Sequence, residues 1–494
     1  MGVRGQGHRL PPLLCPHRLR EVLVAGYPVL LVRNKKEFSA LSSRCPHYGA
    51  PLSKGSPGSR ERLRCPWHGA CFNIRTGDIE EYPSLDCLHC FKVTVEDGKV
   101  FVTAKRKVWT LPAGTTHKQH LGVGSISAFP VSSLVGVAAL VCAETLRQMG
   151  FTGRVIMATK EKHVPYDKSK LSKVSDQGHR EVSASFLPQA VAVDFQKQKV
   201  HFMDGSSQKY NQLLIATGCQ PSLLKVPGAD LQNVCVLQTP EDSSKILELA
   251  TGKNLVIIGA SFIGMEAAAF LSDKAAAISV VEKQEFPFQR VLGPQVGAVT
   301  MKMLQNKGVK FYMQAELRQG SSLPLRTFAA LILAPLPAGT FPSSAFLKGT
   351  SIARDASGAI LVDLHMQTNI PNVFAAGDVA SFPVALLNGE RCSIHHQQVA
   401  EVHGHTAALN MLKKEKQLHT IPFFWTTMFG KSIRYAGRGA AAALGYVHWR
   451  DPRSAFSFRE GVVSAAASLS CDPMVALIAE ALYTGKQISK EEAE

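Results

Sequence analysis

Two short segments, Cys45-Pro46-His47-Tyr48-Gly49-Ala50 and Cys65-Pro66-Trp67-His68-Gly69-Ala70, decide how the first part of the chain folds. Each supplies one thiol and one imidazole, and 17 residues separate the histidine of the first pair from the cysteine of the second. Zinc accepts two Cys and two His ligands, but zinc fingers place the Cys pair and the His pair on separate elements. A two-iron cluster can instead take both thiolates on one iron and both imidazoles on the other. The pattern predicts a metal centre, a two-iron cluster in preference to zinc, with the ligands Cys45, His47, Cys65 and His68.

Short β-rich stretches flank the two segments, at residues 22–24, 28–32, 91–95 and 99–102. The last two are joined by Asp97-Gly98, which is a typical two-residue hairpin turn. We therefore expect an all-β domain over residues 22–105. A basic leader at residues 1–21 precedes it, and a linker at residues 106–125 follows it.

Composition narrows the class of protein. At roughly 100–200 residues per domain, 494 residues predict three or four domains. The 45% hydrophobic content is that of a folded chain, and eleven dispersed cysteines do not resemble a secreted disulfide framework. No apolar run reaches the length of a membrane span. The sequence does not indicate an oligomeric state.

Charged residues are distributed unevenly along the chain. The net charge is +17, and residues 1–120 hold 19 basic against nine acidic side chains. No nucleic-acid-binding motif accompanies the excess, so we expect no nucleic-acid partner. An acidic redox partner or an anionic membrane at this end of the chain is one interpretation, and a solvated surface with a targeting leader is the other. The leader leaves a mitochondrial and a cytoplasmic location both open.

A nucleotide-binding unit is predicted over residues 254–282. A buried strand at 254–258 runs into Gly259-Ala260-Ser261-Phe262-Ile263-Gly264, then a helix at about 265–271 and a strand at 278–281 that ends at Glu282. Gly259 would make the turn, Gly264 would permit helix–strand packing, and the acid would bind ribose hydroxyls. Ser261 stands where the middle glycine is usual. Glu282 favours NADH over NADPH.

An earlier unit is less regular. Leu134-Val135-Gly136-Val137-Ala138-Ala139 leads into a helix, and residues 154–158 read as the next strand. The register suits a glycine turn in which Gly136 and Ala139 approach a dinucleotide, although Leu134 replaces the first glycine. Without its surroundings, this segment is better explained as a buried helix.

Four further motifs follow in order: PYDKSKLSK at 165–173, LIATG at 214–218, NVFAAGD at 372–378 and PFFWT at 422–426. Together they resemble the two-dinucleotide flavoprotein reductases, specifically the relatives of apoptosis-inducing factor that carry an N-terminal Rieske domain. The resemblance covers nearly the whole chain. It implies a [2Fe-2S] cluster, FAD and a nicotinamide cofactor.

The resemblance also implies residue roles. Asp378 would bond the flavin ribityl chain, and Gly377 would let the backbone approach it. Thr217 and Gly218 belong to the same flavin site. Two residues are expected at the reacting ring system: Lys173 near the isoalloxazine, and Trp425 covering the flavin, with core packing as the alternative for Trp425.

The implied architecture is multidomain: an all-β Rieske domain, two α/β Rossmann-like dinucleotide-binding domains and a C-terminal α+β domain. The expected limits are 126–250 with 365–415 for FAD, 251–364 for NAD, and 416–494 for the C-terminal domain. Ala70 stands where respiratory Rieske proteins often carry a hydroxyl, which predicts a low reduction potential.

The expected activity is an NAD(P)H-dependent oxidoreductase that passes electrons through FAD to the Rieske cluster or another acceptor, with a role in apoptosis implied by the resemblance. The alternative is a degenerate relative that keeps only the cluster and acts in interaction or cell-death signalling. Leu134, Ser261 and the unusual stretch at 316–340 favour that alternative.

Overall fold

The computed structural model describes residues 2–4, 8–9, 17–34, 37–58, 61–97, 99–105, 136–163, 166–173, 187–221, 229, 231–315, 330–333, 340–438, 447–448 and 454–493. The predicted linker at 106–125 lies outside these ranges. So do Leu134 and most of the stretch at 316–340.

The N-terminal domain is built on one antiparallel sheet, in the order β1-β11-β10-β5-β4-β3, with β2 paired to β11. Its strands are β1 Gly2–Arg4, β2 His8–Arg9, β3 His17–Val24, β4 Tyr27–Asn34, β5 Glu37–Ser42, β10 Cys90–Glu96 and β11 Lys99–Lys105. Side chains alternate between the two faces of a strand. Leu30 and Val32 of β4 therefore enter the core beneath Cys45 and Cys65, whereas Val29 and Leu31 enter a second core on the opposite face.

A smaller sheet carries the second predicted ligand loop, and the first loop lies in the connection between the two sheets. Its strands, in spatial order, are β6 Ser56–Pro57, β7 Arg62–Arg64, β8 Cys71–Asn73 and β9 Ile79–Glu81. The first loop follows β5 and precedes the short 3-10 helix η1 (Leu52–Lys54), and the second joins β7 to β8. Both close in the same way, since the amide of each cysteine donates to the carbonyl of the alanine five residues later, at 2.9 Å and 2.7 Å.

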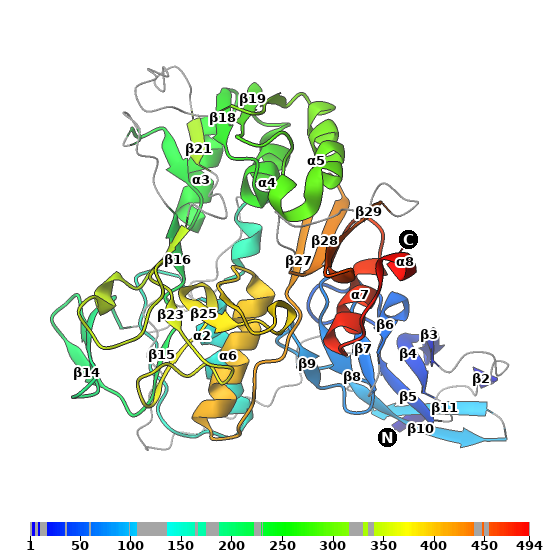
Figure 1. Ribbon diagram of the computed structural model, residues 1–494. Coiled ribbons are helices and arrows are strands. Elements are labelled where there is room, and N and C mark those ends of the chain that lie inside the picture. Colours follow the sequence, from blue (N-terminus) through cyan, green and yellow to red (C-terminus); the bar gives the residue numbers. More distant parts are fainter. Residues whose placement is uncertain are drawn as a thin grey trace.

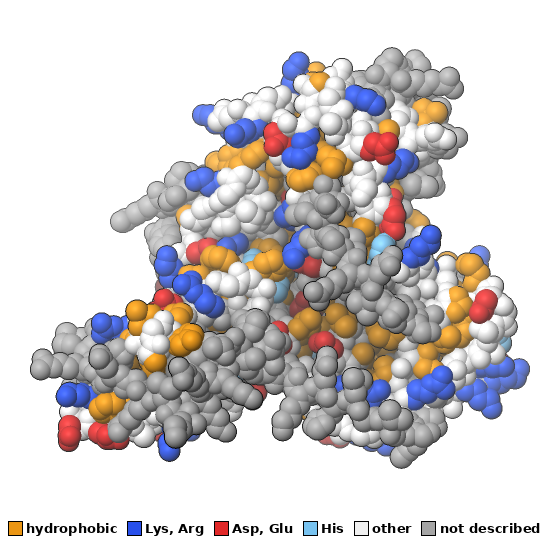
Figure 2. Space-filling view, turned by 180° about the vertical axis from the view of Figure 1, so that it is seen from behind, with side chains coloured by type: hydrophobic (Ala, Val, Ile, Leu, Met, Phe, Trp, Pro, Cys, Tyr) orange, Lys and Arg blue, Asp and Glu red, His pale blue; other side chains and the backbone are white. Residues whose placement is uncertain are grey.

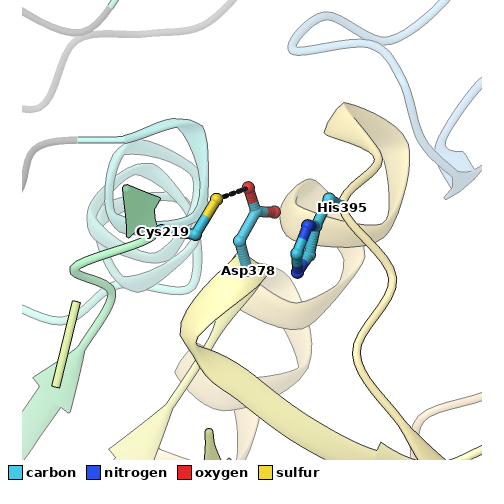
Figure 3. A group of neighbouring side chains, drawn as sticks. All are labelled: Cys219, Asp378 and His395. Carbon is cyan, nitrogen blue, oxygen red and sulfur yellow. Dashed lines mark hydrogen bonds between the residues drawn. The ribbon is translucent and has the colours of Figure 1, made fainter. Parts of the chain in front are cut away.

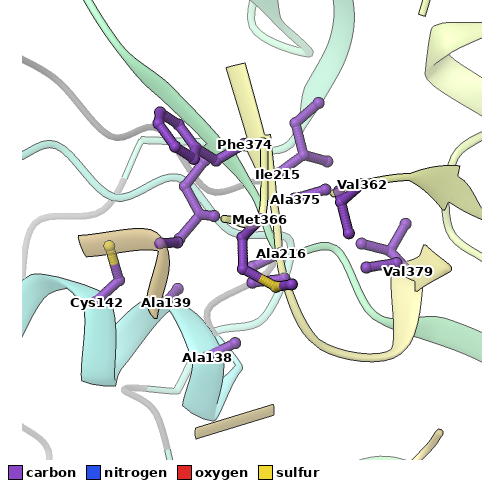
Figure 4. Close-up of a cluster of buried hydrophobic side chains, with 14 of the residues drawn as sticks. Ala138, Ala139, Cys142, Ile215, Ala216, Val362, Met366, Phe374, Ala375 and Val379 are labelled. Atoms are coloured by element: carbon purple, nitrogen blue, oxygen red, sulfur yellow. The ribbon is translucent and has the colours of Figure 1, made fainter. Parts of the chain in front are cut away.

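The second part of the chain packs two helices against each other, α2 Val137–Gln148 and α6 Gln397–Met411. A Cβ atom at Gly404 would lie 2.1 Å from the backbone oxygen of Ala138, so only glycine allows this approach. Beneath the helices lies a parallel strand pair, β15 Leu213–Ile215 and β24 Val373–Ala375. Figure 4 shows the buried core that these elements share.

The same part holds short strands, most of them paired antiparallel, and 3-10 turns. They are η2 Lys168–Lys170, β12 Ala190–Asp194, β13 Lys199–Phe202, β14 Ser207–Lys209, β16 Cys219–Pro221, β22 Thr340–Pro342, η4 Ala345–Leu347, β23 Ile360–Leu361, η5 Gly377–Val379, β25 Ala380–Pro383, η6 Ala385–Leu387 and β26 Arg391–Cys392.

One strand prediction was wrong here. Residues 154–158 make no regular strand and contribute a single bridge, from Ala158 to Leu187. A strand requires a ladder of hydrogen bonds to a neighbour. This segment instead bonds around Leu187, whose amide donates to Met157 and whose carbonyl accepts from Thr159.

The third part is a parallel sheet with the order β17-β21-β18-β19-β20, flanked by three helices (Figure 1). Its elements are β17 Val234–Val236, α3 Pro240–Ala250, β18 Asn254–Ile258, α4 Phe262–Leu271, β19 Ala277–Val281, α5 Gln289–Gln305, β20 Lys310–Tyr312 and β21 Ala330–Leu333. The predicted strand at 254–258 is confirmed. The helix begins earlier than predicted, because the hydroxyl of Ser261 caps it by accepting from the amide of Gly264.

The C-terminal part is an antiparallel sheet in the order β27-β28-β31-β30-β29, covered by α7. Its elements are β27 Phe423–Met428, β28 Lys431–Gly437, β29 Val447–His448, β30 Ser454–Arg459, β31 Val462–Leu469, α7 Met474–Tyr483 and α8 Lys490–Ala493. In Figure 1, α7 lies directly beside the N-terminal domain. The predicted fold class, all-β followed by α/β and α+β parts, is confirmed. Among the described residues, no helix is both long and apolar enough to cross a bilayer.

Candidate cofactor sites

The four predicted metal ligands meet at the tips of the two loops. Cys45, Cys65 and His68 are buried, and His47 is partly exposed. The Nδ1 atoms of His47 and His68 lie 3.1 Å apart. The two thiols form a hydrogen bond with each other. The donors therefore meet as a sulfur pair and a nitrogen pair.

This pairing bears on the choice of metal. In a mononuclear tetrahedral zinc site, ligand bonds of about 2.0–2.3 Å hold all four donors close to one another. Within the described part of the chain, three donors that all lie within 4.8 Å of one another occur at Cys219, Asp378 and His395, and not at these loops. A separated thiolate pair and imidazole pair is the arrangement that a two-iron cluster needs.

The surroundings of the four side chains act on their protonation states, and metal binds thiolates and neutral imidazoles. Backbone amides of His47 and Tyr48 donate to Cys45, and those of Trp67 and His68 donate to Cys65, and each of these bonds favours a thiolate. The hydrogen bond with Cys65, together with burial, nevertheless raises the pKa of Cys45, whereas the pKa of Cys65 is lowered against burial by its bond with Cys45. Burial lowers the pKa of His47 to about 4 and that of His68 well below its ordinary value. Both imidazoles are therefore neutral at physiological pH, as metal ligation requires.

The histidine pair faces the other domains. The Trp425 ring lies 4.7 Å from the His68 ring and 5.7 Å from the His47 ring, between centroids. The hydroxyl of Tyr48 donates to the carboxylate of Asp167, and the ammonium of Lys170 lies 5.0 Å from the Tyr48 ring centroid. The metal loops thus contact both the aromatic strand β27 and the lysine motif at 165–173.

Lys173 belongs to an ionic cluster at the start of α4. Its Nζ lies 2.7 Å from Oε1 of Glu266 and 2.8 Å from the carbonyl oxygen of Ser169. The hydroxyls of Ser172 and Thr426 also donate to Glu266. Lys173 and the strand that carries Trp425 are therefore joined through one buried carboxylate. Our sequence analysis missed Glu266, although an acid within the apolar helix 262–271 was a usable signal.

The remaining predicted flavin residues lie around the ends of α2, β15 and β24. Gly136 is the N-cap of α2, and Ala139 is buried in its first turn. Gly218 and Gly377 have φ angles of +66° and +75°, which side-chain-bearing residues rarely adopt. Cys219 donates to the Asp378 carboxylate at 3.4 Å, and His395 lies on the other side of that carboxylate (Figure 3).

Several buried polar atoms here have no protein partner. They are Thr217 Oγ1, His396 Nδ1 and Glu401 Oε2. Buried polar groups in folded proteins nearly always have a partner, so orphaned atoms in one region point to a bound molecule. With the left-handed glycines beside them, these residues fit a polar cofactor such as FAD.

The predicted nicotinamide-nucleotide residues form a separate group. Gly259 has φ +99° and ends β18, and Gly264 is buried in α4. The side chain of Ser261 is used as the helix cap. The carboxylate of Glu282 accepts from the Ala260 amide at 2.7 Å and is itself buried. The glycine turn and the acid are thus adjacent, and the acid holds the turn; ribose binding by Glu282 stays a prediction.

Comparisons with known proteins define the class. The family profile of pyridine nucleotide-disulphide oxidoreductases matches residues 135–404, and that of Rieske [2Fe-2S] domains matches residues 13–92. The protein is an NAD(P)H oxidoreductase of the ferredoxin reductase kind, with a Rieske domain at its N-terminal end. Its cofactors are a [2Fe-2S] cluster, FAD and NADH.

Its relatives place it more narrowly. It is 43% identical to mouse apoptosis-inducing factor 3 and 42% to the human protein, over 97% of this chain and 84% of each relative. It is 26% identical to the ferredoxin–NAD(+) reductase component of the biphenyl dioxygenase system of Paraburkholderia xenovorans, over 72% of this chain and 93% of that one. The chain belongs to the apoptosis-inducing factor 3 family.

A solved structure of putidaredoxin reductase in covalent complex with putidaredoxin has the same fold. Its TM-score is 0.66 at 19% identity, over 74% of this chain and 95% of that one.

Proposed function

We propose that this protein passes electrons from NADH through FAD to its own Rieske cluster, within one molecule. The observation that carries the proposal is the 4.7 Å contact between the rings of His68 and Trp425. His68 is the proposed ligand of the cluster, and Trp425 is the residue proposed to cover the flavin. One aromatic side chain thus touches both proposed sites.

Two further contacts support the proposal. Tyr48, inside the first ligand loop, bonds to Asp167 in the lysine motif, so the cluster loops and the proposed flavin site share a boundary. On the other side of β27, Phe424 packs against Phe262 of α4, with ring centroids 4.1 Å apart. β27 therefore contacts the ligand loops on one side and α4, the helix of the proposed nucleotide site, on the other.

The chemistry of each step belongs to the cofactors, and the protein supplies position. FAD, when bound, accepts the two electrons of NADH as a hydride and gives them up singly, which suits an acceptor that takes one electron at a time. We assign Lys173 to the flavin ring. Glu266 fixes the Nζ of that lysine at 2.7 Å. Gly377 and Asp378 would hold the ribityl chain.

The test uses purified protein with its cluster and FAD, mixed with NADH without oxygen. The visible spectrum follows flavin, and electron paramagnetic resonance (EPR) follows the reduced cluster. We expect flavin absorbance to bleach and the cluster signal to grow. Protein that holds the cluster but no flavin, even after incubation with FAD, would contradict the proposal. It would favour the alternative, a non-catalytic relative that acts through interaction or cell-death signalling.

For the protein that accepts electrons from the cluster, we propose only a chemical class. The excess of basic residues in the N-terminal 120 favours an acidic redox protein. On the face shown in Figure 2, the described Lys and Arg side chains are scattered rather than gathered in one stripe. Reduction of such a partner should slow as salt is added. Insensitivity to salt would remove this partner class.

A role in apoptosis is a further part of the proposal, resting on the likeness to apoptosis-inducing factor 3. Expression of the chain in cells should lower their survival. Unchanged survival would remove the apoptotic role without touching the redox proposal.

A further inference from the structure

Arg434 reaches the metal loops from a distant part of the sequence. It lies on β28, directly opposite Trp425 of β27 in the antiparallel register. Residues directly opposite on such strands project from the same face of the sheet. Trp425 contacts His68 in the second ligand loop, and Arg434 Nε lies 3.4 Å from the carbonyl oxygen of Pro66 in the same loop. The sheet therefore presents an aromatic ring to the histidine and a guanidinium to the cysteine side.

The guanidinium of Arg434 is not fully satisfied by the protein. The residue is 4% exposed. Its Nε and Nη2 atoms each lie 3.0 Å from the carboxylate of Asp472. Nη1 is buried and has no partner. A buried guanidinium N–H without an acceptor is costly, so the atom points to an acceptor that belongs to the bound cofactor.

The carbonyl oxygen that Arg434 Nε approaches belongs to Pro66, the residue directly after the proposed ligand Cys65. Arg434 therefore lies beside the sulfur side of the proposed cluster. One-electron reduction makes a cluster more negative by one charge, and a nearby cation favours the more negative state.

We infer that Arg434 raises the reduction potential of the cluster, by placing a buried positive charge and a free N–H group beside the Cys65 loop. This inference rests on the proposed cluster ligands and is independent of transfer from flavin. It opposes the low potential expected from Ala70, which offers the cluster no hydroxyl. Because Arg434 belongs to the C-terminal sheet, the potential becomes a property of the docked domains rather than of the Rieske domain alone.

The test is a redox titration of the intact, cluster-loaded protein, followed by EPR. Arg434→Gln removes the charge. At a fixed ambient potential we expect the ratio of reduced to oxidised cluster to fall about tenfold, which is about 59 mV for a one-electron couple. Arg434→Lys keeps the charge and should cause a smaller fall.

A second variant distinguishes an electrostatic effect on the reduction potential from an effect of disturbed packing. Asp472→Asn removes the counter-charge and leaves Arg434 less neutralised, so the potential should rise. Disturbed packing would shift both variants in the same direction. The matched control is Arg459→Gln, which removes a cation from β30 of the same sheet, where it pairs with Glu390 at 3.7 Å. It should leave the potential unchanged. The inference fails if Arg434→Gln keeps the wild-type potential, or if Arg434→Gln and Asp472→Asn shift together.

Discussion

Two glycines that occupy equivalent places in the ligand loops have different surroundings. Gly49 and Gly69 both adopt left-handed backbone, with φ of +74° and +78°. A Cβ at Gly49 would meet nothing within 4 Å, whereas a Cβ at Gly69 would lie 2.7 Å from the ring of Phe423. The first glycine is needed for the turn alone. The second is also needed for the docking of β27 against the loop.

This difference predicts unequal effects of one substitution. Gly49→Ala should cost about 1–2 kcal/mol from left-handed strain. Gly69→Ala should cost roughly 1–3 kcal/mol more, because the loop or Phe423 must move. Thermal unfolding and iron content of the two variants measure the difference. Equal losses would show that the contact with Phe423 does not constrain the loop.

Glu401 is a buried acid whose protonation should affect stability. Burial raises its pKa to about 8 from the ordinary 4.5. Its Oε1 accepts from Gln397, and the charge of Asp167 faces it from the lysine motif. Because the folded protein holds this proton more tightly than the unfolded chain, the group's contribution to stability is complete below pH 4.5 and is lost as the pH rises through 8.

Glu401→Gln imitates the protonated acid and should remove that loss. We expect the free energy of unfolding of the variant to match wild type near pH 4.5 and to exceed it by roughly 2–4 kcal/mol above pH 8. Denaturant unfolding at both pH values measures this. A difference between variant and wild type that does not change with pH would contradict the assignment.

At the scale of elements, a buried ionic network fastens the small Rieske sheet to the C-terminal helix. Arg62 of β7 pairs with Glu81 of β9 at 2.8 Å and with Glu480 of α7 at 3.0 Å. Arg64 of β7 contacts the same two carboxylates, and all four side chains are buried. These two arginines and two glutamates are the buried members, and Arg62 also pairs with the more exposed Glu80 at 2.9 Å, so both arginine charges are compensated while the domains are docked.

Glu480→Gln should break that balance. Removing one partner of a buried ionic group costs about 3–5 kcal/mol, because the remaining charges stay buried without compensation. The matched control is Glu390→Gln, whose exposed pair with Arg459 at 3.7 Å should be worth no more than about 1 kcal/mol. Denaturant unfolding compares the two. Similar small losses would mean that the network does not hold the domains together.

Local patterns in the sequence predicted the elements, but they did not predict how the elements meet. The strand at 254–258 and the paired ligand loops follow from short-range patterns of apolar residues, glycines and ligands. The expected strand at 154–158 fails because a strand depends on its partner, which local pattern does not reveal. The ionic network could not be foreseen, since Arg62 and Glu480 are 418 residues apart. Likewise, the aromatic motif at 422–426 gave no sign that Trp425 would lie against His68.

At the scale of the whole molecule, these contacts fix the Rieske domain against the rest of the chain. Trp425 of β27, Asp167 of the lysine motif and Glu480 of α7 contact it from separate elements. Electron transfer to the cluster should therefore require no domain movement. We expect the rate of cluster reduction by NADH to stay constant as solvent viscosity is raised with sucrose. A rate that falls in proportion to viscosity would indicate a mobile domain.

Rapid mixing tests directly whether electrons pass from the flavin to the Rieske cluster within one molecule. Protein carrying cluster and FAD is mixed with excess NADH without oxygen, and cluster reduction is followed by freeze-quench EPR over a wide range of protein concentration. Our account predicts a first-order rate constant that does not depend on protein concentration. A rate constant that rises in proportion to protein concentration, or a cluster that stays oxidised while flavin bleaches, would contradict it.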